Sequence, residues 1–545
     1  MAAVALGLVL AACTPGASQT ASTSGAASAS QPEEVEQVLH LNMSQEPQFL
    51  DPQQATDSIS IQVLRSISHP LVYYNEGLEL VPGLADSWEV SPDGQTITFH
   101  LGAHKYSDGS DIVADDFVTG FRRLGDPRVA SGYSYVLDPV VGFADLQGAD
   151  PDSDEAVEAA LENFGVEAPD PQTFVVHLAR PAAYFAYIAA LWLTAPVRDD
   201  FVFTEAEGYV SSGPMMMEEW NHQSNIVLVP NPNWNGDEVA IDRIELAMIN
   251  DPAASLAAYD NDELDVTGVP SADVARIRDD PQYADQILEG DRLAVSYYGF
   301  DLKNPDGPFT NSVLLRKAFN EALDKEVLVQ TVFGGVGTVA HSLVPPGMPG
   351  HQEDEFIPFD TDQAKADFDQ ALNDLGITAD DLQLQLGYNV AGSNEDQAVF
   401  FQEQWRSTFG IEVELVATED FGSYLDILND DPYDIFRLGW GADYPHPNNF
   451  LTDLISCTST NNNMGYCNEE VDQLLEQAAA EPTLETQVPL YNQAQEMVMA
   501  DAPIIPQLFS QAFTLVKPWV QGFTPTAQDS NSGELFYYKT SIAAH

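Results

Sequence analysis

Apolar and polar residues alternate along much of the chain in the two periods that indicate strands and helices. The segment 80–101 predicts a hairpin, because apolar residues alternate on both arms and Ser91-Pro92-Asp93-Gly94 supplies a turn. Alternation also predicts strands over 382–388 and 411–417, and a short strand at Asp265-Val266.

Other segments carry apolar residues at helical spacing. We expect a helix over 311–332, a short one over 251–259, and two more over 361–376 and 395–409. Thr361 is the expected cap of the third segment, and Gly376 and Gly410 are expected to end their helices. This strand–helix–strand order predicts a mixed α/β fold with helices packed on a sheet.

Length sets the number of folding units. A chain of 545 residues with 44% hydrophobic content is too long for one ordinary domain, so two or three lobes are expected. No apolar run reaches about 18 residues, the length that a membrane-spanning helix needs.

Charge narrows the possible partners. The chain has 20 Lys plus Arg against 85 Asp plus Glu, a net charge of −65. Such a surface repels nucleic acid and anionic lipid headgroups, so nucleic acid is not an expected partner. Solubility in a salty or acidic environment is the simplest interpretation, and attraction of cationic ligands is the alternative.

The first residues resemble a bacterial lipoprotein signal. A short apolar run, Val4 to Ala12, ends in Leu10-Ala11-Ala12-Cys13, which is similar to a lipobox. The resemblance implies a signal segment over 1–12 and a lipid on the Cys13 thiol, hence a membrane anchor. No Lys or Arg precedes the run, so Met1 is interpreted as an internal start. The alternative is an uncleaved, disordered leader.

A tether is expected after this cysteine. Thr14 to Gln31 consists almost wholly of Ser, Thr, Ala, Gly and Gln, which cannot bury a core, so 13–39 is expected to be flexible. With Cys13 lipidated, Cys457 and Cys467 can pair outside the reducing cytoplasm, at a gain of about 2–3 kcal/mol. A metal site is disfavoured, because no His lies near the two cysteines.

Motifs of common enzymes do not occur. The sequence has no phosphate-binding Gly-Lys-Ser/Thr loop, no His-Glu-x-x-His and no Gly-x-Ser-x-Gly. Asp260, Asp262 and Asp265 alternate like calcium ligands but lack the Gly and terminal Glu of a calcium loop. We therefore expect no enzyme activity, no cofactor and no metal, with a surface hydrolase as an unfavoured alternative.

Several segments together resemble the oligopeptide-binding proteins of Opp-type ABC importers, the peptide/nickel class of solute-binding proteins. The strongest is Asp434-Ile-Phe-Arg-Leu-Gly-Trp-Gly-Ala-Asp-Tyr444. Weaker matches are Pro82–Trp88, Tyr106–Gly109, Ala114–Phe117, Pro230–Trp234 and Val516–Val520, although Asp111 stands where proline is usual. The resemblance runs from about residue 40 to the end.

The family fold is a two-lobed clamp of the type II periplasmic-binding-protein kind, with an extra inserted α/β domain. The resemblance implies lobe one over 40–58, 205–294 and 512–545, the inserted domain over 59–204, and lobe two over 295–511. Hinges are then expected near Val295 and Gln511.

The same resemblance implies the ligand contacts. Asp443 would accept the α-ammonium of a peptide and Arg437 its carboxylate, with a structural salt bridge as the alternative for Arg437. The remaining implied contacts are Gly439, Trp440 and Gly441 along the peptide backbone, Phe421 and Leu425 as pocket walls, Tyr297, Tyr298, Glu46, Tyr133 or Tyr135, and Asn462 or Asn463. Enteric members have a cysteine pair at what are here Val295 and Gly441, and this chain has neither.

The resemblance implies a monomeric lipoprotein on the outer face of the cytoplasmic membrane. It would capture oligopeptides and deliver them to the permease and ATPase subunits of an ABC importer. The alternative keeps the fold and changes the ligand to an oligosaccharide, a nickel chelate, haem or a signalling peptide.

Overall fold

The largest sheet has seven strands, in the order β11-β17-β12-β16-β14-β15 with β13 beside β17. The computed structural model describes residues 35–545. The strands are β11 (Val266–Gly268), β12 (Ile287–Phe300), β13 (Thr338–Val339), β14 (Leu384–Asn389), β15 (Val413–Thr418), β16 (Ile435–Gly441) and β17 (Ile504–Val516). The central pairs β12–β16 and β12–β17 are antiparallel, whereas β14 runs parallel to both of its neighbours.

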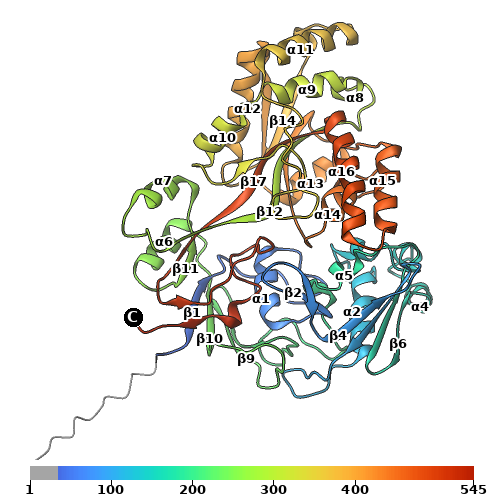
Figure 1. Ribbon diagram of the computed structural model, residues 1–545, viewed down its shortest axis with the longest axis vertical. Helices are drawn as coiled ribbons and strands as arrows, with labels where there is room; N and C mark the ends of the chain where they lie inside the picture. The colour runs from blue at the N-terminus through green and yellow to red at the C-terminus, as the bar shows by residue number, and fades with distance from the viewer. Residues whose placement is uncertain (1–34) are drawn as a thin grey trace, which may run out of the picture. The chain divides into compact units, whose positions relative to one another are not determined.

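Helices cover both faces of this sheet. One face packs on α8 (Pro308–Asn311), α9 (Val313–Glu321), α10 (Lys325–Val332), α11 (Thr361–Leu375) and α12 (Asn394–Phe409). The other packs on α13 (Phe421–Asp430), α14 (Asn448–Ile455), α15 (Glu469–Ala480) and α16 (Leu484–Asp501), of which α15 and α16 lie side by side in Figure 1. Alternation along β12 places Tyr297 in one apolar cluster and Tyr298 in the other.

A four-stranded sheet is built from segments far apart in the sequence. Its order is β1-β10-β9-β8, from β1 (Val38–Asn42), β8 (Met215–Asn221), β9 (Asn225–Pro230) and β10 (Arg243–Ala247). The C-terminal elements are β18 (Val520–Gln521), η4 (Tyr537–Lys539) and β19 (Ser541–Ile542), and helices α6 (Pro252–Asp260) and α7 (Ser271–Asp279) follow β10 and β11. The Gln37 amide donates to the Ile542 carbonyl at 2.9 Å and accepts from its N–H at 2.8 Å.

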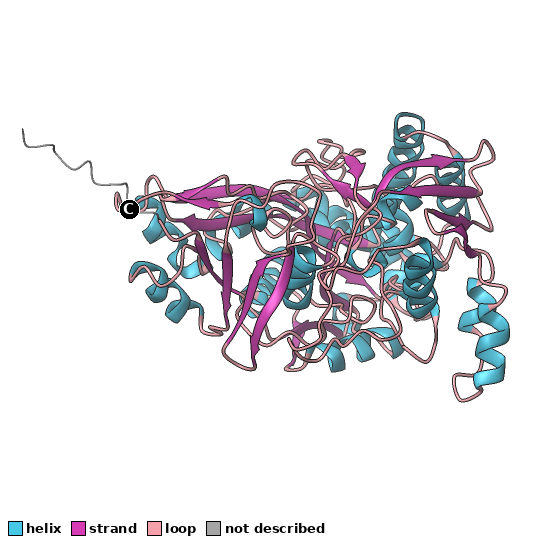
Figure 2. Cartoon of the chain, turned by 90° about the horizontal axis from the view of Figure 1, so that it is seen from below, coloured by secondary structure: helices cyan, strands magenta, loops and turns pink. Residues whose placement is uncertain are grey.

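The segment between β1 and β8 forms a separate antiparallel sheet of order β4-β5-β7-β6. Its strands are β4 (Ala85–Val90), β5 (Thr96–Leu101), β6 (Val166–Asp170) and β7 (Thr173–His177), preceded by the hairpin of β2 (Val72–Tyr74) and β3 (Leu80–Pro82). The helices here are α1 (Ser58–Ile67), α2 (Ala114–Gly125), η1 (Ser134–Leu137), α3 (Phe143–Gln147), α4 (Asp154–Leu161), α5 (Phe185–Ile188) and η2 (Trp192–Thr194). Figure 2 shows the same mixture of helices and strands throughout the described chain.

Strands β12 and β17 connect the large sheet to the elements around β1. They pair from Ile287 opposite Leu515 to Gly299 opposite Ile504, with register shifts between Asp291 and Val295 and between Ser296 and Tyr297. At the far end β11 joins β17, and the Asp265 N–H donates to the His40 carbonyl. The expected hinge positions lie inside these two strands; the expected start of the inserted domain, residue 59, lies inside α1, and all the lobe boundaries stay predictions.

Several secondary-structure predictions are confirmed and three need correction. The hairpin is β4–β5, and Gly376 and Gly410 end their helices in the left-handed conformation, each with φ of 72°. The single helix expected over 311–332 is wrong, because Ser312 and Asp324 accept backbone N–H bonds as N-caps and divide it into α8, α9 and α10. Asp360, not Thr361, caps α11.

The third correction concerns the tether, which was expected to reach residue 39. Strand β1 already begins at Val38 and pairs in parallel with β10, so the last residues of that range are ordered. Cys13, the expected signal segment over 1–12 and the expected tether up to residue 34 lie outside the described residues. Within residues 35–545, no helix combines the length and the apolar character needed to cross a membrane.

Candidate ligand-binding site

Asp443 follows the end of β16, and its carboxylate is surrounded by hydrogen-bond donors from three separate parts of the chain. The Tyr133 hydroxyl donates to Oδ1 at 2.9 Å and the Tyr135 hydroxyl to Oδ2 at 3.0 Å. The Asn449 side chain, at the start of α14, donates to Oδ2 at 3.1 Å. The fold thus brings together Tyr133 and Asp443, which are 310 positions apart in the sequence.

Two amide side chains fix the backbone around Asp443. The Asn449 Oδ1 atom accepts from the Asp443 N–H at 2.9 Å and from the Trp440 indole at 3.3 Å. The Gln528 amide donates to the carbonyls of Asp443, at 3.1 Å, and of Ala442. The carboxylate is therefore held in one orientation before any ligand contact is considered.

The electrostatics of Asp443 are those of a buried acid without a cationic partner. Burial raises the pKa of Asp443, while the bonds from Asn449, Tyr133 and Tyr135 and the more distant charge of Arg65 act to lower it. Within residues 35–545 no basic side chain forms an ion pair with this carboxylate, and Arg65 is instead bonded to Glu534 at 2.5 Å. A cation placed here would gain a desolvated, charge-assisted contact.

Arg437 lies opposite Tyr298 in the pairing of β16 with β12. Burial lowers the pKa of its guanidinium, and its Nε atom is buried with no hydrogen-bond partner. No ion pair to Arg437 exists within the described chain, which argues against the structural salt bridge considered as the alternative. A buried, unpaired guanidinium can bind an anionic group strongly.

Three of the residues between these two charges form the last part of β16. Gly439 and Trp440 are half-buried and Gly441 is exposed, and a Cβ added to Gly441 would meet nothing within 4 Å. At Gly439 an added Cβ would lie 3.3 Å from the Val295 carbonyl oxygen, so that position has little room. Gly441 therefore has open space beside it, and contact of this stretch with a peptide backbone stays a prediction.

Strand geometry separates the two neighbouring tyrosines. Tyr297 and Tyr298 are both fully buried, their hydroxyls have no partner, and they point to opposite faces of the sheet. Both cannot therefore contact one ligand from the same side. Burial raises both tyrosine pKa values, against a smaller lowering by Arg437.

The expected wall residues differ in exposure. The side chain of Phe421, at the start of α13, is exposed, whereas Leu425 packs against the apolar cluster that contains Tyr424 and Phe450. The exposed ring of Phe421 is therefore not part of the helix core.

The carboxylate of Glu46 is bonded to residues at the β8–β9 turn. Its carboxylate accepts from the Trp220 indole at 2.8 Å and the Gln223 N–H at 2.5 Å, and it contacts His222 at 2.8 Å, all at the β8–β9 turn. Burial raises the pKa of Glu46, but the bonds from Gln223, His222 and Trp220 outweigh it and the pKa is lowered. No hydrogen bond joins Glu46 to the Asp443 group within the described chain.

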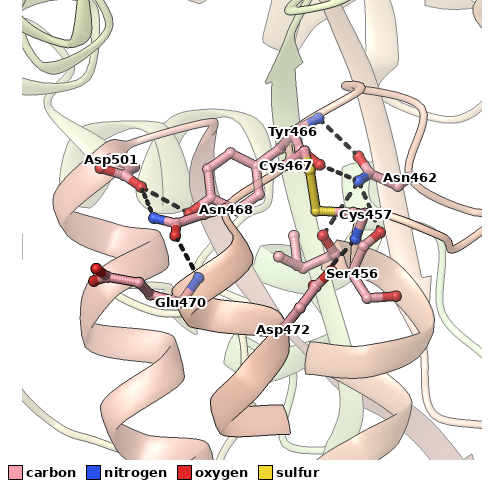
Figure 3. The surroundings of a disulfide bond; sticks show 10 residues. Ser456, Cys457, Asn462, Tyr466, Cys467, Asn468, Glu470, Asp472 and Asp501 are labelled. Carbon is pink, nitrogen blue, oxygen red and sulfur yellow. Dashed lines mark hydrogen bonds between the residues drawn. A yellow bond between two sulfur atoms is a disulfide. The ribbon is translucent and has the colours of Figure 1, made fainter. Parts of the chain in front are cut away.

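A disulfide joins Cys457 to Cys467 and closes a loop that precedes α15 (Figure 3). The Asn462 amide donates within this loop to the carbonyls of Ile455, Ser456 and Tyr466, and the Asn463 amide donates to Asn429 at 2.9 Å. Both amides are thus bonded to the protein itself, and a contact of either one with a ligand stays a prediction.

Sequence reasoning missed three residues that organise the site. Asn449 and Gln528 position Asp443, and Asp453 on α14 shares the Asn449 amide at 3.0 Å. Only their place after the Asp443 motif could have indicated Asn449 and Asp453, and nothing local indicates Gln528. Within residues 35–545 no group of three or more His, Cys, Asp or Glu is arranged to hold a metal ion.

Comparison with known proteins identifies the family to which the chain belongs. The model of the bacterial extracellular solute-binding proteins, family 5, matches residues 79–462, so the chain belongs to this family. The fold is accordingly the two-lobed clamp with an inserted domain.

Individual relatives cover nearly the whole chain. The oligopeptide-binding protein OppA of Bacillus subtilis is 29% identical over 498 residues, covering 89% of this chain and 88% of the relative. The structure of the Escherichia coli murein tripeptide-binding protein MppA matches with a TM-score of 0.77 at 26% identity, over 94% of this chain and 99% of that one. OppA of Haemophilus influenzae in complex with the peptide RPPGFSPFR matches with a TM-score of 0.76 at 26% identity, over 94% of this chain and 100% of that one.

Proposed function

We propose that this chain captures oligopeptides between its two lobes and delivers them to the permease and ATPase of an ABC importer. The observation that carries this proposal is the Asp443 carboxylate, which is buried, held by Tyr133, Tyr135 and Asn449, and without an ion-pair partner in the described chain. A peptide α-ammonium supplies the missing positive charge.

Arg437 supports the same ligand. A free peptide carries a carboxylate at its other end, and Arg437 is an unpaired guanidinium on the strand that leads to Asp443. The two charges together select a zwitterion, which a neutral oligosaccharide is not. The printed names of the relatives, oligopeptide-binding and murein tripeptide-binding, agree with a peptide.

The proposal includes an anchored, extracytoplasmic monomer. The lipobox-like Leu10-Ala11-Ala12-Cys13 supports lipidation at Cys13, and the Ser- and Ala-rich stretch after it supports a tether to the membrane surface. The Cys457–Cys467 disulfide agrees with an oxidising compartment.

Native mass spectrometry of the form that begins after Cys13, purified without removing bound molecules, tests the ligand. Co-purified masses that match a mixture of short peptides would support the proposal and give their length range. A single non-peptide mass, together with no calorimetric binding of a peptide mixture, would overturn the ligand and leave the family unchanged.

A further inference from the structure

A cavity of about 270 Å³ lies next to Tyr135, one of the residues that donate to Asp443. It is enclosed by residues of the segment between β1 and β8 and by residues that follow β16. Tyr135, Arg180 and Tyr184 line one side, and Tyr444, Thr452 and Asp453 line the other. Tyr135 belongs both to this cavity and to the Asp443 group, because its hydroxyl donates to Asp443. The volume suits one side chain rather than a whole ligand.

Asp453 is held rigidly at the wall of this cavity. Its Oδ2 atom accepts from the Tyr444 hydroxyl at 2.8 Å and from Asn449 at 3.0 Å, and its Oδ1 atom has only a 3.3 Å bond from Asn448. Its backbone carbonyl accepts from Ser459 and from Asn461, inside the disulfide-closed loop. The neighbouring Thr452 hydroxyl is buried with no partner, so polar groups on this wall remain to be satisfied.

The charges around the cavity do not balance. Asp443 and Asp453 share the single amide of Asn449, and neither forms an ion pair within the described chain. The nearby arginines are committed elsewhere, Arg180 to Asp138 and Arg65 to Glu534. A peptide α-ammonium neutralises only one of the two carboxylates, so the other, when it is ionised, can pair with a second positive charge.

We propose that this cavity binds a cationic side chain, the ammonium of lysine or the guanidinium of arginine, carried by the first residue of the ligand. The inference rests on the proposed function, because it takes the α-ammonium to lie at Asp443. Asp453 then determines specificity: it contacts the first side chain, while the hydroxyls of Tyr444, Tyr184 and Thr452 complete a polar wall. The long, unbranched stem of lysine can reach into such a pocket while the backbone stays at Asp443.

The titration of Asp453 gives the pocket a pH dependence. Burial raises the pKa of Asp453 to about 7, Asp443 and Asp138 raise it too, and the bonds from Tyr444 and Asn449 lower it. The other ionisable groups whose charges act with it are Tyr135, Tyr184, Tyr444 and Tyr491, and Arg180 lines the same cavity. Because the carboxylate forms above about pH 7, affinity for a cation rises with pH there.

Calorimetry with two matched tripeptides tests the pocket. Lys-Ala-Ala and norleucine-Ala-Ala have first side chains of nearly the same shape, and only lysine carries a charge. We expect the wild-type protein to bind the lysine peptide at least about tenfold more tightly at pH 8, with a smaller ratio at pH 5.5. In Asp453→Asn the ratio should fall below about threefold at both pH values. Asp369→Asn, an exposed acid on α11, is the charge-matched control and should keep the wild-type ratio.

The outcomes separate the two proposals. If neither peptide binds the wild-type protein, the proposed function fails. If both bind with equal affinity at both pH values, the function stands and the pocket assignment is overturned. The wild-type pH series requires no variant, so the test holds even if Asp453→Asn does not fold.

Discussion

Two pairs of carboxylates with little contact with water differ in whether the protein supplies a counter-charge. Glu534 and Asp529 meet a cation: Arg65 donates to Glu534 at 2.5 Å and lies 4.0 Å from Asp529. Asp443 and Asp453 meet only hydroxyls and amides. A charge that the protein compensates itself contributes to the fold, whereas a charge left without a counter-charge is available to a ligand.

The largest effect on stability is expected when the ion pair between Arg65 and Glu534 is broken. Arg65→Met leaves Glu534, which is fully buried, without its cation, and should lower the free energy of unfolding by about 3–5 kcal/mol. Denaturant titration measures the change. Arg406→Met is the matched control, because its partner Glu403 is half-exposed, and it should cost less than about 1 kcal/mol. Equal losses in the two variants would contradict the comparison.

Removing the charge of Asp443, which has no counter-charge in the described chain, should weaken peptide binding more than it lowers the free energy of unfolding. Asp443→Asn keeps the shape of the side chain and removes its charge, so the free energy of peptide binding should weaken by about 2–5 kcal/mol. The free energy of unfolding should fall by less than in Arg65→Met, about 1–3 kcal/mol, because an oxygen that accepts hydrogen bonds is lost but no ion pair is broken. Calorimetry and denaturant titration on the same preparation measure both. A loss of stability as large as that of Arg65→Met would show that Asp443 is structural.

The disulfide-closed loop contacts the backbone of Asp453 through Ser459 and Asn461. Removing the disulfide tests whether this loop is also needed to position Asp443. The double variant Cys457→Ser, Cys467→Ser opens a short loop and should lower the free energy of unfolding by about 2–3 kcal/mol. Peptides that begin with norleucine should bind as before, since Tyr133, Tyr135 and Asn449 lie outside the loop. A parallel loss of affinity for these peptides would mean that the loop holds the whole site.

The smallest expected effect is a change in the pH dependence of stability. The pKa of Asp453 is raised to about 7 in the folded state, so its proton is bound more tightly there than in the unfolded chain. Its stabilising contribution is present at low pH and is lost as the pH rises through about 7. Asp453→Asn should therefore gain stability relative to wild type between pH 5 and pH 8. Denaturant titrations at several pH values measure the difference, and a pH-independent difference would argue against the raised pKa.

Local pattern and local chemistry account for the parts of the fold that could be predicted. The β4–β5 hairpin, β14, β15 and the end of α12 follow from alternation and from glycines in the left-handed conformation. The prediction of one helix over 311–332 is wrong because Ser312 and Asp324 interrupt the apolar helical period. Their side chains accept backbone N–H groups and so begin a new helix instead of continuing the previous one.

Some residues of the candidate site could likewise be predicted from the sequence, and others could not. Arg437 and Asp443 could be named because one short motif contains both of them. Gln528 could not, since its contact with Asp443 depends on a fold that brings together residues 85 positions apart. For Asn462 and Glu46, the sequence does not show that the amide and the carboxylate already have partners in the protein.

The hydrogen bonds between Gln37 and Ile542 have a consequence for how the protein is made. They join residues that are 505 positions apart, next to a sheet in which β1 pairs with β10. This contact cannot form until residue 542 has left the ribosome, so the start of the described chain makes its final contacts only after nearly the whole chain has been made.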